Sequence, residues 1–150
     1  MTVRIVTATL DHLNDLVTLF DAYCVFYQQP SNSQQARVFL SERFLLRENV
    51  VFLAYDDENR AVGFTQLYPI FSSVYMQREW LLNDLYVVPE ARGKRIGEKL
   101  IERSIEHAKL SGARGVMLET AHSNISGQRL YERMGFVRED LEFRVYFKVV

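Results

Sequence analysis

The sequence predicts one α/β domain with a central mixed β-sheet that carries helices on both faces. Segments with the apolar spacing of a helix alternate with short β-rich segments along all 150 residues. No repeat, low-complexity stretch or linker divides the chain, so we expect a single domain over residues 1–150. Hydrophobic residues make up 48% of the sequence, enough to build a core at this length without disulfides or metals.

The predicted strands are short runs rich in β-branched and aromatic residues, bounded by polar or glycine-containing turns. They cover residues 3–7, 49–55, 61–68, 80–88 and 116–120, with one or two more in 136–137 and 143–149. The polar residues 56–59 form a turn that joins two of these strands into a hairpin. Residues 68–73, which include Pro69, are typical of a turn-rich insertion between strands. The sheet should therefore have six or seven strands.

Four segments place apolar residues every three or four positions, the spacing of one helix face. They cover residues 13–27, 36–45, 96–110 and 125–134. Thr9 is a suitable N-cap for the first helix, and Pro30 ends it. Ser111 and Gly112 end the third helix, and Gly135 closes the fourth. We therefore expect about four helices around the sheet.

The charge and hydropathy of the chain argue against nucleic acid and membrane as partners. Its 18 lysines and arginines balance 19 aspartates and glutamates, and no basic stripe runs along it. No apolar run approaches the roughly 20 residues needed to cross a bilayer, and the first residues lack the apolar stretch of a signal peptide. We therefore expect a cytoplasmic protein.

Metal and hydrolase chemistry lack a motif in this sequence. Cys24 is the single cysteine, so no intrachain disulfide can form, and its position in a helical pattern favours a buried hydrophobe. The three histidines, His12, His107 and His122, have no ligand spacing relative to one another or to Cys24, so we expect no metal. The Gly-x-Ser-x-Gly elbow of many hydrolases is missing.

The most informative segment is a helix start crowded with cations, residues 92–97, with the sequence Arg-Gly-Lys-Arg-Ile-Gly. A helix N-terminus already carries about half a positive charge, so Arg92, Lys94 and Arg95 are unfavourable there unless an anion lies among them. We therefore expect a phosphate site. Gly97 supports this. Glycine inside a helix costs about 1 kcal/mol relative to alanine, and this cost is most easily justified where a ligand or a neighbouring backbone comes very close. The alternative is a solvated basic turn.

The glycine spacing is neither that of a Walker A loop nor that of a dinucleotide-binding fold. It resembles the coenzyme A loop of the GCN5-related N-acetyltransferases, Gln/Arg-x-x-Gly-x-Gly/Ala after a strand, with Arg95 where that family prefers glycine. Residues 124–136 resemble the family's second motif, Asn-x-x-Ala/Gly-x-x-Leu-Tyr-x-x-x-Gly-Phe. The likeness covers essentially the whole chain and implies a mostly antiparallel sheet with acetyl-CoA as the donor. The cofactor-binding residues that it implies are Leu85, Tyr86, Val87, Arg92, Gly93, Lys94, Arg95, Ile96, Gly97 and Asn124.

Tyr131 and Asn124 belong to the second motif, and each has two interpretations. The resemblance implies that Tyr131 gives a proton to the departing thiolate, and a phenol with a pKa of about 10 holds that proton at neutral pH. Alternatively, Tyr131 packs beside its helix neighbours. Asn124 either only caps the helix that starts at Ile125 or also binds the coenzyme arm.

The general base is expected within the strand at residues 80–88, where Asn83 and Asp84 interrupt an apolar run. Asp84 is the first candidate, because a carboxylate in such a strand needs partners or a function to offset its desolvation. The strand also resembles that of spermidine/spermine N-acetyltransferases, but their proposed base falls on Asn83, whose amide cannot take a proton. Glu79 or a water relay is the alternative. Only a local bulge would let Asn83 and Asp84 reach the same site.

The acceptor is expected to be a primary amine of a small molecule, such as a polyamine or an amino acid. Aromatic residues near Tyr27, together with Asp84 or Glu79, would attract an ammonium group. The substrate-binding candidates are Tyr27, Glu79 and Asn83. A protein lysine or N-terminus as acceptor, and a non-catalytic coenzyme A-binding module, are the alternatives. A homodimer would use the β-rich residues 143–149, which would otherwise form a bare strand edge.

Overall fold

The computed structural model describes residues 2–140 and 142–150, and the chain falls into two compact units. The first unit, Met1–Leu118, contains the sheet and three of the helices. The second, Glu119–Val150, contains a short helix and an extended C-terminal segment.

The first unit is built on a five-stranded sheet in which every strand lies beside its neighbours in the chain, in the order β1-β2-β3-β4-β5. Its strands are β1 (Arg4–Thr7), β2 (Val50–Tyr55), β3 (Ala61–Ser72), β4 (Gln77–Val87) and β5 (Val116–Met117). The first four strands pair antiparallel, and β5 runs parallel to β4. The predicted mixed, mostly antiparallel sheet is confirmed, with fewer strands than expected.

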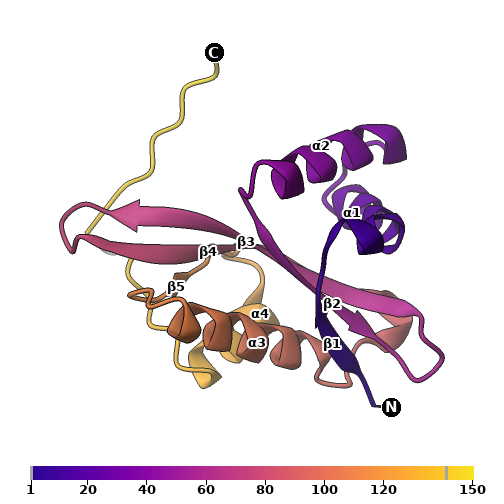
Figure 1. The fold of residues 1–150 in the computed structure, drawn as a ribbon. Coiled ribbons are helices and arrows are strands. Elements are labelled where there is room, and N and C mark those ends of the chain that lie inside the picture. Colours follow the sequence, from indigo (N-terminus) through magenta and orange to yellow (C-terminus); the bar gives the residue numbers. More distant parts are fainter. Residues whose placement is uncertain (1, 141) are drawn as a thin grey trace. The chain divides into compact units, whose positions relative to one another are not determined.

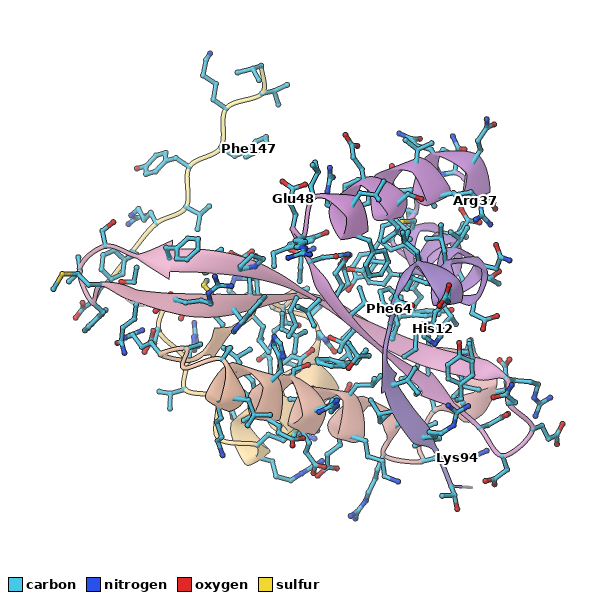
Figure 2. The ribbon with its side chains drawn as sticks, viewed as in Figure 1. His12, Arg37, Glu48, Phe64, Lys94 and Phe147 are labelled. Atoms are coloured by element: carbon cyan, nitrogen blue, oxygen red, sulfur yellow. The ribbon has the colours of Figure 1, made fainter. Side chains whose placement is uncertain are left out.

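Helices cover both faces of this sheet, as predicted (Figure 1). The helices α1 (Leu13–Phe26) and α2 (Ser33–Leu45) lie on one face, and α3 (Ile96–Leu110) lies on the other. Thr9 caps the short 3₁₀ turn Leu10–His12 that leads into α1, in a reciprocal capping box with His12. The buried face of α1 packs on β3, and Phe64 of β3 lies beneath it within 5.7 Å of the ring of Tyr23 (Figure 2).

The β3–β4 hairpin is longer than the sequence predicts. Residues 68–73 are mostly strand and not a turn-rich insertion, because β3 continues to Ser72 and pairs with β4 throughout. The sequence interpretation was wrong because it took Pro69 as a strand breaker. Pairing between β2 and β3 ends at Leu67, so beyond it β3 has a neighbour on one side only, an edge position that accommodates proline.

The second unit contains α4 (Ile125–Arg133) and confirms the predicted short helix. The one or two final strands predicted in residues 136–137 and 143–149 are wrong for the described residues, which form no strand after Arg133. The side chains from Phe143 to Phe147 include rings that are 78% to 89% exposed, and Phe147 extends from this segment in Figure 2. A strand needs a neighbour to bond, and high β-propensity alone does not supply one.

Candidate active site

One edge of β4 is open over the half of the strand that leads toward α3. Among the described residues, β5 is the strand beside this edge, and it pairs only with Trp80 and Leu81. On the other side, the N–H of Val88 donates to the carbonyl of Val62, next to the directly opposed pair of Gly63 and Val87. Because bonding alternates along an antiparallel pair, Leu85 and Val87 turn their N–H and C=O groups away from β3 and toward the open edge.

A β-bulge at Asn83 decides which face of the sheet the following side chains occupy. Gln66 lies opposite Asp84 but Leu67 lies opposite Leu82, so Asn83 is the extra residue. An extra residue reverses the alternation of side chains. Trp80 contacts His107 of α3, whereas Tyr86, six positions later, contacts Tyr23 of α1 on the opposite face. The bulge that the sequence required for Asn83 and Asp84 to act together is present.

Asp84 is a buried carboxylate held by three side chains. It is 5% exposed, its Oδ2 accepts a hydrogen bond from Gln66 at 2.7 Å, and its Oδ1 accepts one from Asn83 at 3.1 Å. Burial raises the pKa of Asp84, and the hydrogen bonds from Gln66, Tyr23 and Asn83 oppose the increase. Burial, and after it the negative charge of Asp84, raises the pKa of Tyr23 in turn.

Two residues of this network were missed by the sequence analysis. Gln66 is fully buried in β3, and its Oε1 accepts a hydrogen bond from Asn49 at 2.7 Å. The Oδ1 atom of Asn49 is buried and has no hydrogen-bond partner among the described residues. The available signal was an amide inside the apolar run at residues 61–68, since a buried amide requires partners.

Aromatic rings from α1 and β4 gather beside Asp84. The rings of Tyr23 and Tyr27 lie 5.0 Å apart, and Phe26 lies 6.4 Å from Tyr86. Tyr27 and Phe26 are each 60% exposed, so they form an exposed aromatic rim next to Tyr23, which donates a hydrogen bond to the buried carboxylate. Of the predicted acceptor residues, Asn83 therefore hydrogen-bonds Asp84 directly, and Tyr27 is connected to it through the ring of Tyr23.

Glu79, the alternative base, is engaged elsewhere in the first unit. Its Oε2 lies 2.5 Å from a guanidinium nitrogen of Arg114, which also lies 3.7 Å over the ring of Tyr75. The pair is partly exposed. Asp84 is therefore the carboxylate on β4 that lies among neutral hydrogen-bond donors, whereas Glu79 pairs with a cation.

The loop after β4 has the backbone shape of an anion site. A 3₁₀ turn, Pro89–Ala91, leads into it, and Gly93 and Arg95 both have positive φ, 78° and 62°. Arg95 thus adopts the left-handed conformation that normally favours glycine. No side chain of the described residues caps α3 at Arg95. The N–H groups of the first helical turn have no intrahelical acceptor and can bond an anion.

The exposed cations and an open space complete this end of α3. Lys94 and Arg95 are exposed, and Lys94 is labelled in Figure 2. A Cβ added to Gly97 would meet no atom within 4 Å, so packing within the protein does not require glycine there. The chemistry of the loop fits a diphosphate that comes close to the backbone.

Arg92 is placed differently from Lys94 and Arg95. Its Nε donates to the carbonyl of Val87 at 2.9 Å, and its guanidinium lies over the rings of Phe26 and Tyr86. Its backbone N–H donates to Pro89. The three predicted cations therefore divide between the loop surface and the aromatic rim.

The second unit holds the other two predicted residues. Asn124 caps α4, because its Oδ1 accepts the N–H of Gly127 at 3.1 Å and its Nδ2 donates to Thr120 at 2.9 Å. The structure confirms that Asn124 caps this helix, which both interpretations of the residue include. Tyr131 lies within α4, and its ring centroid is 6.1 Å from that of Phe136 in an edge-to-face contact.

In residues 2–140 and 142–150 we find no group of three or more His, Cys, Asp or Glu side chains arranged to hold a metal ion. Over the same residues, every helix is too short or too polar to cross a membrane.

Comparison with known proteins identifies the family. Residues 16–136 match the model of the acetyltransferase (GNAT) family. An uncharacterized N-acetyltransferase of Bacillus subtilis, YhfO, is 42% identical over 131 residues, 87% of each chain, and a probable acetyltransferase of Haemophilus influenzae is 31% identical over 81% of each. A crystal structure of a probable acetyltransferase, 41% identical, covers 98% of this chain and 97% of its own with a TM-score of 0.91. The chain therefore belongs to the acetyltransferase (GNAT) family and is an enzyme of the N-acetyltransferase type.

Proposed function

We propose that this acetyltransferase takes its acetyl group from acetyl-CoA and transfers it to a primary amine of a small molecule. One observation carries the cofactor part: the open edge of β4 leads into a loop with exposed cations and a helix start without a side-chain cap, where the space beside Gly97 is open. A chain with amide groups can bond to a strand edge, and a diphosphate can bond to a helix N-terminus. A predicted acetyltransferase of Clostridium acetobutylicum that shares the fold, with a TM-score of 0.77 and 15% identity, was solved with acetyl-CoA.

The residues divide between the two parts of the cofactor. The N–H groups of Gly93 through Gly97 and the side chains of Lys94 and Arg95 bind the diphosphate, with Ile96 anchoring the helix start in the core. Leu85 and Val87 bind the amide arm through their backbone groups. Tyr86 supports them from the other face of the strand, and Asn124 of the second unit contributes a side-chain amide.

Acetyl-CoA, when bound, supplies the acetyl group as a thioester whose carbonyl the amine attacks. The strand edge at Leu85 and Val87 polarises that carbonyl through backbone N–H donors. Asp84 receives the proton of the amine, and its raised pKa makes it a stronger base than an exposed carboxylate. The hydroxyl of Tyr131 gives its proton to the departing thiolate. Tyr27 and Asn83 contact the acceptor, and Glu79 with its Arg114 partner lies outside the proton path.

The buried charge of Asp84 beneath exposed rings supports a cationic acceptor, because an ammonium group gains from both a carboxylate and aromatic faces. A small amine fits this rim better than a peptide, which would need an extended groove. We further propose a cytoplasmic homodimer in which residues 143–149 find a strand partner, since a β-rich segment this exposed is otherwise an aggregation risk. We retain a single functional domain over residues 1–150.

A thiol-release assay tests this function. With acetyl-CoA and separate panels of polyamines, amino acids and peptides, we expect turnover on small amines. The Tyr131→Phe variant should lower kcat about 100-fold or more, the usual contribution of a general acid, with little change in KM for acetyl-CoA. Turnover on peptides alone would show a protein acetyltransferase. Binding of acetyl-CoA without turnover on any amine would show a non-catalytic binding module.

A further inference from the structure

Arg92 makes three contacts that a phosphate ligand would not need. Its Nε donates to the Val87 carbonyl at 2.9 Å, its guanidinium carbon lies 5.4 Å from the ring centroid of Phe26, and it lies 5.7 Å from that of Tyr86. Phe26 is the last residue of α1, and Tyr86 lies in β4. Arg92 thus contacts both β4, the strand that leads into its own loop, and the last residue of α1, which belongs to the acceptor rim.

The Val87 carbonyl is one of the groups that β4 presents at its open edge. A strand edge presents N–H and C=O groups that no neighbouring strand holds in place. A guanidinium bonded to this carbonyl fixes the direction of the peptide that follows Val87. The rings of Phe26 and Tyr86 hold the guanidinium in turn, because the two rings lie 6.4 Å apart and both are within cation–π distance of it.

We propose that Arg92 is a positioning residue and not a phosphate ligand. It ties the open edge of β4 at Val87 to the end of α1 at Phe26, so that the strand groups for the cofactor arm and the aromatic rim for the acceptor keep one arrangement. This inference rests on the proposed function. The three cations of the loop then have two roles. Lys94 and Arg95 bind the anion, and Arg92 fixes the edge of β4 relative to the end of α1.

The chemistry of the side chain supports this role. A planar guanidinium can donate a hydrogen bond in its plane to the Val87 carbonyl while it lies over neighbouring aromatic rings, and the compact ammonium of a lysine lacks this planar geometry. An Arg92→Lys variant would keep the positive charge near the loop and lose that geometry. A phosphate ligand would tolerate that change better than a positioning residue.

The first measurement is the affinity for coenzyme A at low and high salt, by calorimetry, on the full chain. The Lys94→Gln variant should lose affinity chiefly at low salt, since salt screens an exposed charge. The Arg92→Gln and Arg92→Lys variants should lose affinity by a similar factor of about three to ten at both salt concentrations, because the loss of geometry is not screened. Arg92→Gln following the salt pattern of Lys94→Gln, with Arg92→Lys unaffected, would overturn the proposal.

The second measurement uses Phe26, which is uncharged. Phe26→Leu should weaken coenzyme A binding about threefold in the wild-type background and by less than twofold when Arg92 is already glutamine. Phe71→Leu, another exposed aromatic of the first unit, is the matched control and should change nothing. Both residues are exposed, and a thermal melt checks that each variant folds.

The outcomes separate this inference from the function on which it rests. If the wild-type protein binds no coenzyme A, the proposed function fails, and the edge of β4 that Arg92 would position binds no cofactor. If the wild-type protein binds it and Phe26→Leu is without effect in either background, the proposed function stands and the role of Arg92 is wrong.

Discussion

Replacing Gly97 with alanine should stabilise the free protein and weaken its binding of coenzyme A. The added Cβ meets no atom within 4 Å, so the helix gains the difference in propensity, about 0.5–1 kcal/mol, which raises Tm by about 2 °C in a chain of this size. The same methyl group occupies the space in which we place the diphosphate. Loss of one hydrogen bond to a charged group costs about 1.5–3 kcal/mol, which lowers the affinity about ten- to a hundredfold.

Scanning calorimetry measures the first effect, and titration with coenzyme A measures the second. Gly115→Ala is the matched control, because its Cβ also meets nothing within 4 Å and the residue lies before β5, apart from the loop. It should leave the affinity unchanged. Equal affinity in Gly97→Ala and the wild-type protein would refute the reasoning, since no ligand would then come close to this backbone.

Three further predictions concern backbone conformation, proton linkage and helix capping. Arg95→Gly should raise the stability by about 0.5 kcal/mol in urea unfolding, because relief of the left-handed conformation, about 1–2 kcal/mol, exceeds the added freedom of the unfolded chain; a loss of stability would contradict it. Burial raises the pKa of Asp84 above its ordinary 3.8, so the folded protein keeps a proton that the unfolded chain has lost. Its contribution to the free energy of unfolding is fully present below pH 3.8 and is lost as the pH rises through the raised pKa of Asp84. The Asp84→Asn variant should abolish this decline. A decline that persists in the variant would belong to another group. Gly127→Ala should displace the Asn124 side chain, with which its Cβ would clash, and cost α4 about 1 kcal/mol, detected as faster amide exchange in that helix than in α3.

Helices were predictable because their signals are local. The repeating apolar face of α1 and its Thr9 cap lie within one short stretch of sequence, and so does the Ser111–Gly112 end of α3. The cations before α3 were found for the same reason. Residues 92–97 carry their charge pattern, their glycines and their place before a helix in one continuous segment.

Strand pairing was less predictable because it depends on residues far apart in the chain. Pro69 was taken as a breaker because the sequence does not show that β2 ends at the partner of Leu67. The exposed C-terminal segment has strong β-propensity, but the described residues offer it no strand neighbour. Local propensity therefore overestimated the number of strands.

The candidate site shows the same division. The positions of Asp84 and Asn83 were found from their polarity in an apolar strand, and the sequence indicated that a bulge was needed for them to act together. Their partner Gln66 was missed because it is 18 residues away and meets Asp84 only through the register of β3 and β4. The placement of Arg92 over Phe26 could not be predicted for the same reason, since strands β2, β3 and β4 separate the two residues in the chain.

The most direct test of the central claim, that the open edge of β4 and the start of α3 hold the cofactor, is an amide NMR titration with coenzyme A. We expect the N–H signals of Leu85, Val87 and Gly97 to shift together and saturate at one ligand concentration, while those of Ala54 and Phe64, inside the sheet, stay in place. Saturable binding that leaves Leu85, Val87 and Gly97 unshifted would contradict the account.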